Sequence, residues 1–158
     1  MHRLSRILLP LAFATGAAAA SAECLVSRPE ASPVTVPGMG DAPWFGSESL
    51  AVRLPAKGRW DGMGSADPFR DKSSFWGPGY VAASEPRPDL KITGVKLEDE
   101  RTIHTLSVGR ATNAFGPAWQ QMLVLVEFPS AGCWRVSATY VNAGIRHVLA
   151  FVVDVADR

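Results

Sequence analysis

The sequence has little cysteine and almost no net charge. Two cysteines, Cys24 and Cys133, occur in 158 residues, and the formal net charge at pH 7 is +1. Structural zinc takes about four ligands at close spacing, so this pair by itself does not indicate a zinc site. Nucleic-acid binding requires a basic field that displaces counterions from phosphates. The balance of 16 basic and 15 acidic residues excludes that class of function.

Motifs of catalysis and of cofactor binding are also lacking. The chain contains no Gly-x-Ser-x-Gly elbow for a nucleophilic serine, and no Gly-x-Gly-x-x-Gly or phosphate-binding loop. Beyond residue 22 there are two histidines, His104 and His147, and neither has a second ligand or base nearby in the sequence. We interpret both as solvated strand residues. The sequence therefore predicts no catalytic residue, no metal and no cofactor, and it favours a non-enzymatic protein.

Only one long apolar run is present, and it stands at the N-terminus. Arg3 and Arg6 precede it without any acidic residue, and it ends in a small-residue Ala-Ser-Ala exit. A basic head, an apolar stretch of about 7–15 residues and such an exit are typical of a secretory signal, whereas a membrane span needs about 20 apolar residues. We expect a signal peptide over residues 1–22 and no membrane span after it. An uncut N-terminal anchor is the alternative.

The two cysteines lie beyond the expected signal. In an oxidising compartment Cys24 and Cys133 are expected to form a disulfide, which would tie the start of the mature chain to a strand near its end. Two free thiols, or a bridge between two chains, are the alternatives. Signal and disulfide together predict an extracytoplasmic protein, either periplasmic or secreted.

Helical periodicity is absent beyond the signal, and apolar residues alternate instead. Residues 49–54, 122–128, 133–140 and 145–155 have the period of two, or the continuous apolar character, that strands show. About seven or eight such short strands with turn signals between them predict a single antiparallel β-sandwich.

The middle of the chain is harder to assign. Residues 90–97 read as a strand in which Gly94 marks a change of phase, which suggests a β-bulge. Residues 98–101 are charged and are expected to form a turn, and residues 103–108 form a further strand candidate. A helical turn within residues 111–121 is the one alternative to strand or loop there.

Composition divides the chain into three parts. Residues 1–22 are the signal peptide, residues 23–43 form an extended proline-rich arm, and residues 44–158 form the β-sandwich domain. Within the arm, residues 34–36 are a candidate edge strand. Residues 55–89 are rich in glycine, proline and aromatic residues, and we expect a long packed loop with one short strand around Phe75 and Trp76.

A C-terminal motif resembles a known group of domains. Residues 128–136 read Phe-Pro-Ser-Ala-Gly-Cys-Trp-Arg-Val, and residues 149–153 read Leu-Ala-Phe-Val-Val. These strands resemble those of uncharacterised exported bacterial domains with an immunoglobulin-like β-sandwich. The resemblance covers roughly residues 44–155, and it implies the fold and the compartment without implying a reaction.

Aromatic residues are the strongest indication of a binding surface. Trp134, beside a cysteine, is expected in the core. Trp60 and Trp76 in the long loop offer faces on which a sugar or a protein partner could stack, and the alternative is that they close one end of the sandwich. The candidate binding residues are Trp60, Trp76, Tyr80 and Trp119.

Two functions follow from these residues. The first is an exported, non-enzymatic binding module or envelope-associated interaction module, whose partner is an unknown protein or glycan. The second is a carbohydrate-binding module or weak glycan hydrolase that uses Trp60 and Trp76 with Asp67 or Asp71. A metal-handling protein that uses His104 and His147 is a third, weaker hypothesis. The sequence does not fix the oligomeric state.

Overall fold

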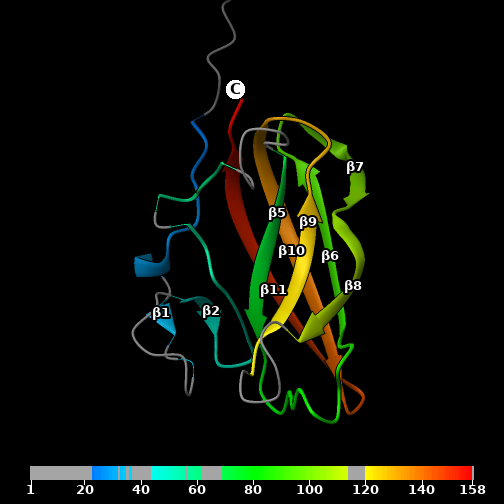
Figure 1. Cartoon of the computed structure of the whole chain (residues 1–158). Helices are drawn as coiled ribbons and strands as arrows, with labels where there is room; N and C mark the ends of the chain where they lie inside the picture. Colours follow the sequence, from blue (N-terminus) through cyan, green and yellow to red (C-terminus); the bar gives the residue numbers. More distant parts are fainter. Residues whose placement is uncertain are drawn as a thin grey trace, which may run out of the picture.

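The protein is all-β, as the sequence predicts. The computed structural model describes residues 23–31, 33–34, 36, 44–55, 57–61, 69–113 and 120–157. Within these ranges the only helical element is a short 3-10 helix, η1 (Pro29–Ala31), and everything else of regular structure is strand (Figure 1). The expected signal peptide, residues 1–22, lies outside the described residues.

One sheet contains six of the described strands in the order β1-β2-β3-β5-β9-β8, and every pair in it is antiparallel. The candidate edge strand at residues 34–36 overlaps β1 only at Val34, and β1 pairs with β2 at one edge of this sheet. The strands of this sheet are β1 (Pro33–Val34), β2 (Trp44–Ser47), β3 (Leu50–Val52), β5 (Arg70–Trp76), β8 (Ser107–Asn113) and β9 (Met122–Glu127).

The other sheet contains five described strands in the order β4-β11-β10-β6-β7. Adjacent strands in this sheet are antiparallel, except that β4 runs parallel to β11. The long β10–β11 hairpin forms the centre of this sheet (Figure 1). The strands of this sheet are β4 (Arg59–Trp60), β6 (Asp89–Lys96), β7 (Asp99–Thr105), β10 (Gly132–Asn142) and β11 (Ile145–Val155).

The core lies between the two sheets because each long strand alternates buried with more exposed residues. In β9, for example, Met122, Val124 and Val126 are buried and the residues between them are only partly so. Burying a large apolar side chain contributes about 1.5–3 kcal/mol. Trp134 is fully buried in this core, as predicted, and packs against Phe128 with 5.6 Å between ring centroids.

A second, smaller cluster lies on the outer face of the six-stranded sheet. Ala51 stands between two residues of the main core, and successive side chains of a strand point to opposite faces. Ala51 therefore packs on the outside, where it meets Val36, Trp44 and the partly buried Trp76. A segment from the N-terminal arm thus contributes to covering this sheet.

The expected disulfide is present between Cys24 and Cys133, with 5.6 Å between the Cα atoms. Two hydrogen bonds between Ser27 and Val152 continue the attachment along β11. The Ser27 N–H donates to the Val152 carbonyl at 2.8 Å, and the Val152 N–H donates to Ser27 Oγ at 2.9 Å. The start of the described chain is therefore fixed to the five-stranded sheet.

Residues 99–113 form one extended course that changes sheets. The structure corrects two expectations here, because residues 99–101 belong to β7 rather than to a turn, and the strand candidate 103–108 is two strands. β7 pairs with β6, and β8 pairs with β9 in the opposite sheet. Leu106 stands at the crossing and is fully buried. The predicted bulge is confirmed, since the β6–β7 register shifts between Gly94 and Lys96.

Residues 55–89 contain more regular structure than the loop expected there. β4 joins the edge of the five-stranded sheet beside β11, and β5 is a central strand of the six-stranded sheet. The short strand expected around Phe75 and Trp76 is the end of β5, which begins at Arg70. The sequence did not reveal the first part of this strand for two reasons. Glycine and proline lie in the segments that flank it, and two of its outward residues, Arg70 and Lys72, are charged.

Candidate functional site

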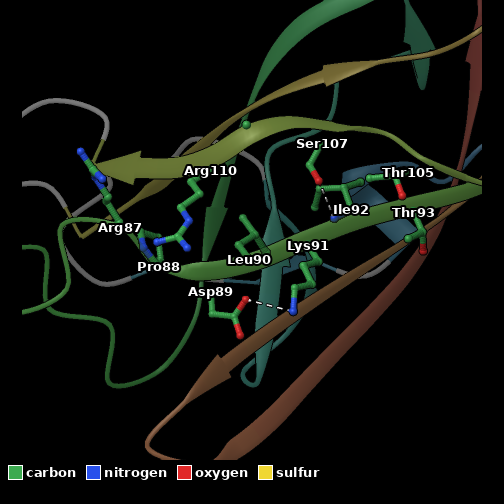
Figure 2. Close-up of a pocket in the computed structure, with 11 residues that line it drawn as sticks. Arg87, Pro88, Asp89, Leu90, Lys91, Ile92, Thr93, Thr105, Ser107 and Arg110 are labelled. Atoms are coloured by element: carbon green, nitrogen blue, oxygen red, sulfur yellow. Dashed lines mark hydrogen bonds and ion pairs between the residues drawn. The ribbon is translucent and has the colours of Figure 1, made fainter.

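A groove of about 670 Å³ opens on one side of the sandwich, between β6 and β8 (Figure 2). It lies where the chain, after β7, separates from β6 and continues as β8 in the other sheet. The segment before β6, the first half of β6, the end of β7 and the start of β8 form its walls. The lining residues are Arg87, Pro88, Asp89, Leu90, Lys91, Ile92, Thr93, Thr105, Ser107, Gly109 and Arg110.

The groove is bordered by two strand edges that have no strand partner among the described residues. β7 pairs with β6 only from Thr93 onward, and Ile92 forms hydrogen bonds with Leu106 and Ser107. Residues 89–91 of β6 therefore have no described strand neighbour on the side away from β10. β8 is the terminal strand of its sheet and pairs only with β9. Free strand edges are templates for further pairing, and proteins usually cover or blunt them.

The hydrogen-bond directions of β6 show which backbone groups face the groove. The Leu106 N–H donates to the Ile92 carbonyl at 2.9 Å, and Ser107 Oγ accepts a long bond of 3.5 Å from the Ile92 N–H. Backbone groups alternate in direction along a strand, so the Leu90 carbonyl points to the same side. The Leu90 N–H is used locally and donates to the Pro88 carbonyl at 2.9 Å.

Positive charge gathers at one end of the groove. Arg87 and Arg110 are exposed and lie at the end marked by Pro88, whereas Thr93 and Thr105 lie at the other end (Figure 2). Lys91 forms an exposed ion pair with Asp89 at 3.4 Å. Neither arginine pairs with an acid among the described residues. The groove thus offers two guanidinium groups to a ligand.

The sequence-predicted aromatic residues lie elsewhere. Trp60 is buried at the edge of the five-stranded sheet, with its ring edge-on to Phe128 at 5.2 Å. Trp76 belongs to the outer cluster on the other sheet, and Trp119 lies outside the described residues. Trp60, Trp76 and Tyr80 therefore do not share one exposed surface, and Trp60 and Tyr80 are parts of the core.

Tyr80 belongs to an aromatic cluster at one end of the sandwich. It packs edge-on against Tyr140 at 6.3 Å, and the Tyr140 hydroxyl donates to a Glu85 carboxylate oxygen at 2.7 Å. Burial and the neighbouring Glu85 carboxylate raise the pKa of both Tyr80 and Tyr140 above the ordinary tyrosine value. Both phenols therefore stay protonated, and the cluster acts as a structural closure rather than as a base.

The histidines do not come together. His104 packs edge-on against Trp134, and His147 stacks on Tyr140. Trp134 and Tyr140 are both on β10, and at about 3.3 Å per residue they are about 20 Å apart. No group of three or more histidine, cysteine or acidic residues suitable for a metal ion occurs among the described residues. The described residues therefore do not bring His104 and His147 together into the site that the metal-handling hypothesis requires.

Sequence reasoning did not find the groove. It depends on where one extended course leaves one sheet for the other, and no short motif encodes that. The available signals were Pro86 and Pro88 directly before β6 and a glycine inside β8, since proline and glycine are common where pairing stops or bulges. Gly109 has a φ of +74° and lies where the register of β8 against β9 shifts.

The described residues contain no helix with the length and apolar character needed to cross a membrane. Comparison of the chain with protein-family models, with curated proteins and with solved structures finds no match.

Proposed function

We propose that this chain is an exported, non-enzymatic binding module that holds an extended segment of a partner protein in the β6–β8 groove. The observation that carries the proposal is the pair of unpartnered strand edges on the two sides of one groove. Peptide recognition by strand addition uses this arrangement, because the backbone of the peptide supplies hydrogen bonds and its side chains supply specificity.

The charge of the groove selects the partner. A segment with an acidic side chain would place its carboxylate near Arg87 and Arg110, which have no acidic partner among the described residues. Arginine binds carboxylates with two parallel, charge-assisted hydrogen bonds. Leu90 and Ile92 alternate along β6 and are buried in the core, so the segment would contact this part of β6 through backbone groups.

Export and an immunoglobulin-like character belong to the same proposal. The disulfide between Cys24 and Cys133 is of a kind that persists in oxidising compartments. The signal-like pattern of residues 1–22 adds to this. Two mainly antiparallel sheets that are linked by a course changing sheets fit an immunoglobulin-like sandwich. We place the protein in the periplasm or outside the cell.

The test uses short synthetic peptides of alternating valine and threonine that carry aspartate, with matched peptides that carry lysine instead. Their binding to the purified, isotope-labelled chain is followed by nuclear magnetic resonance. The aspartate peptides are expected to shift the backbone signals of Leu90, Ile92 and Ser107. Arg110→Glu should weaken this binding about tenfold or more, because it replaces a charge-assisted hydrogen bond with repulsion.

The matched control is Arg146→Glu, which reverses an exposed arginine on β11 outside the groove. It should leave the affinity unchanged. Equal binding of the lysine and aspartate peptides, or signal shifts confined to residues outside the groove, would refute strand addition here. Binding lost equally in both arginine variants would show a nonspecific charge effect and would also count against the proposal.

A further inference from the structure

A second cavity, of about 350 Å³, lies at the edge of the sandwich between β4 and β5. It is separate from the β6–β8 groove and shares no lining residue with it. The segment after β3 forms one wall, and Trp60 forms another. The lining residues are Arg53, Leu54, Pro55, Trp60, Asp71, Lys72 and Ser73, which we call the β5 pocket.

Two buried polar atoms of the lining residues have no hydrogen-bond partner among the described residues. They are the indole Nε1 of Trp60 and the hydroxyl oxygen of Ser73, and each of these residues is only 3% exposed. Native structures rarely leave buried donors unpaired, because such a group has lost its water without a replacement. A ligand that accepts from the indole N–H and bonds to the hydroxyl would supply that replacement.

Asp71 adds an acceptor on the same face. Ser73 and Phe75 point into the sandwich, and the period of two along β5 places Asp71 on the same side. Its Oδ1 accepts from the Lys72 N–H at 2.7 Å, and no described residue donates to its other oxygen. Desolvation raises the pKa of Asp71, although the bond from Lys72 opposes this. A neutral donor on that oxygen would satisfy it.

The charges and walls of the pocket define the ligand. Asp71, on the pocket side of β5, disfavours an anion, whereas Lys72 belongs to the opposite face of the strand and Arg53 is exposed. A hydroxyl group is neutral, and it accepts from an indole N–H and donates to a carboxylate. Leu54, Pro55 and the indole ring supply apolar walls for C–H groups. The volume is near the lower end of small-molecule sites and suits one ring.

We propose that the β5 pocket binds one ring of a polyhydroxylated ligand, a monosaccharide unit or a cyclic polyol. Trp60 Nε1–H donates to one hydroxyl oxygen, and Asp71 accepts from a neighbouring hydroxyl. Ser73 completes the set with its own hydroxyl. The site differs from a stacking platform, because the edge of the indole, and not its face, carries the recognition.

The test follows the indole N–H signal of Trp60 in the isotope-labelled full chain during titration with glucose, galactose, mannose, N-acetylglucosamine and myo-inositol. At least one of them should shift this signal in a saturable way. A response to the sugars alone assigns a glycan unit, and a response to myo-inositol alone assigns a cyclic polyol. Glycine and cyclohexylamine serve as zwitterionic and cationic probes, and preferential binding of either one would overturn the proposal.

Substitutions locate the effect. Asp71→Asn and Ser73→Ala should each weaken binding by about tenfold, since each removes a group that the ligand needs. Ser74→Ala is the matched control, because Ser74 is the next residue of β5 and points to the other face. Arg110→Glu should also leave this binding intact, so that failure of the peptide groove and failure of this pocket are distinguishable.

Absence of any saturable shift with all five hydroxylated probes would refute the proposal. An affinity that is unchanged in both Asp71→Asn and Ser73→Ala would do the same. If Ser73→Ala does not fold, as judged by the dispersion of its spectrum, the decision passes to Asp71→Asn, because Asp71 is not fully buried and its substitution keeps the side-chain shape.

Discussion

At the scale of single residues, polar side chains on the core side are few, and two of them, Asp71 and Ser73, line the β5 pocket. Among the described residues only Ser73 and Gln121 are buried polar side chains, and Asp71 sits two positions before Ser73 on the same strand. Every other inward position of β5 and β9 is apolar. An acid and a hydroxyl on a core-facing strand are unfavourable for stability, which is typical of positions kept for binding.

Asp71→Asn is expected to stabilise the chain at neutral pH. The folded-state pKa of Asp71 is raised by desolvation from its ordinary value of 3.8, so the fold favours the protonated form. The stability that this preference contributes is present below the unfolded pKa and is lost as pH rises through the raised folded pKa. Urea unfolding across the acidic range should show the two proteins converging at low pH, with the variant more stable at pH 7.

The control is Asp89→Asn, which replaces an exposed acid that forms an ion pair with Lys91. Its stability should follow that of the parent chain within about 0.5 kcal/mol at all pH values, because exposed pairs contribute little. Parallel curves for the parent chain and Asp71→Asn would show that Asp71 is fully solvated, and would contradict the description of the pocket.

At the scale of elements, the course from β7 to β8 determines where the groove lies. Leu106 fills the crossing, and its side chain packs onto Gly94 of β6. A Cβ added at Gly94 would stand 2.7 Å from a Leu106 methyl carbon and 3.3 Å from the Arg135 carbonyl oxygen. The bulge glycine therefore leaves room for the side chain that crosses between the sheets.

Gly94→Ala is expected to destabilise the fold by about 1–3 kcal/mol, because overpacking at a buried site forces neighbours to move. Denaturant unfolding of the single variant and of Gly94→Ala combined with Leu106→Val measures this. The smaller valine relieves the clash, so the two changes should cost less together than the sum of their separate effects. Strict additivity would mean that the two residues do not share this contact.

Sequence patterning predicted the strongest elements. β9, β10 and β11 follow the expected ranges within two residues at each end, because their buried faces are continuous and apolar. The pattern fails at β5 and β7, whose exposed charged residues resemble loops. β5 is paired with β3 and β9, and β7 is paired with β6. Such pairing depends on the tertiary structure, so the local sequence does not predict it.

At the scale of the whole molecule, one covalent link joins parts of the chain that are far apart. Cys24 and Cys133 are separated by 109 positions, and the bridge holds the N-terminal segment against the β10–β11 hairpin. The same segment leads to η1 and β1, whose strand adds to the opposite sheet. The N-terminal segment is therefore attached to the five-stranded sheet by the disulfide and to the six-stranded sheet by β1.

Replacing both cysteines with alanine is expected to lower the free energy of unfolding by about 2–5 kcal/mol, since the unfolded chain regains the freedom of a long loop. Urea unfolding of the parent chain with and without reductant, compared with the double variant, measures the effect. Reductant should change only the parent chain. An unchanged unfolding midpoint in the double variant would show that the bridge does not contribute to stability.

The candidate site was predictable only in part. Asp71 and Trp60 were both candidates in the sequence, and the fold places them on the walls of the same pocket. Ser73 was not a candidate, because a serine between two charged residues and a second serine reads as surface. The pairing partner Val124, which is buried, shows that the position faces inward.

By itself, the sequence determined the all-β class, the disulfide between the only two cysteines and the core-facing side of the C-terminal strands, because alternation of apolar residues and cysteine chemistry are local or compositional. Only the tertiary structure decided that residues 99–113 divide between two sheets. That division frees part of the edges of β6 and β8, and the fold places Trp60 of β4 and Ser73 of β5 on the walls of one pocket. Both candidate sites depend on non-local strand pairing, which no single segment of the chain encodes.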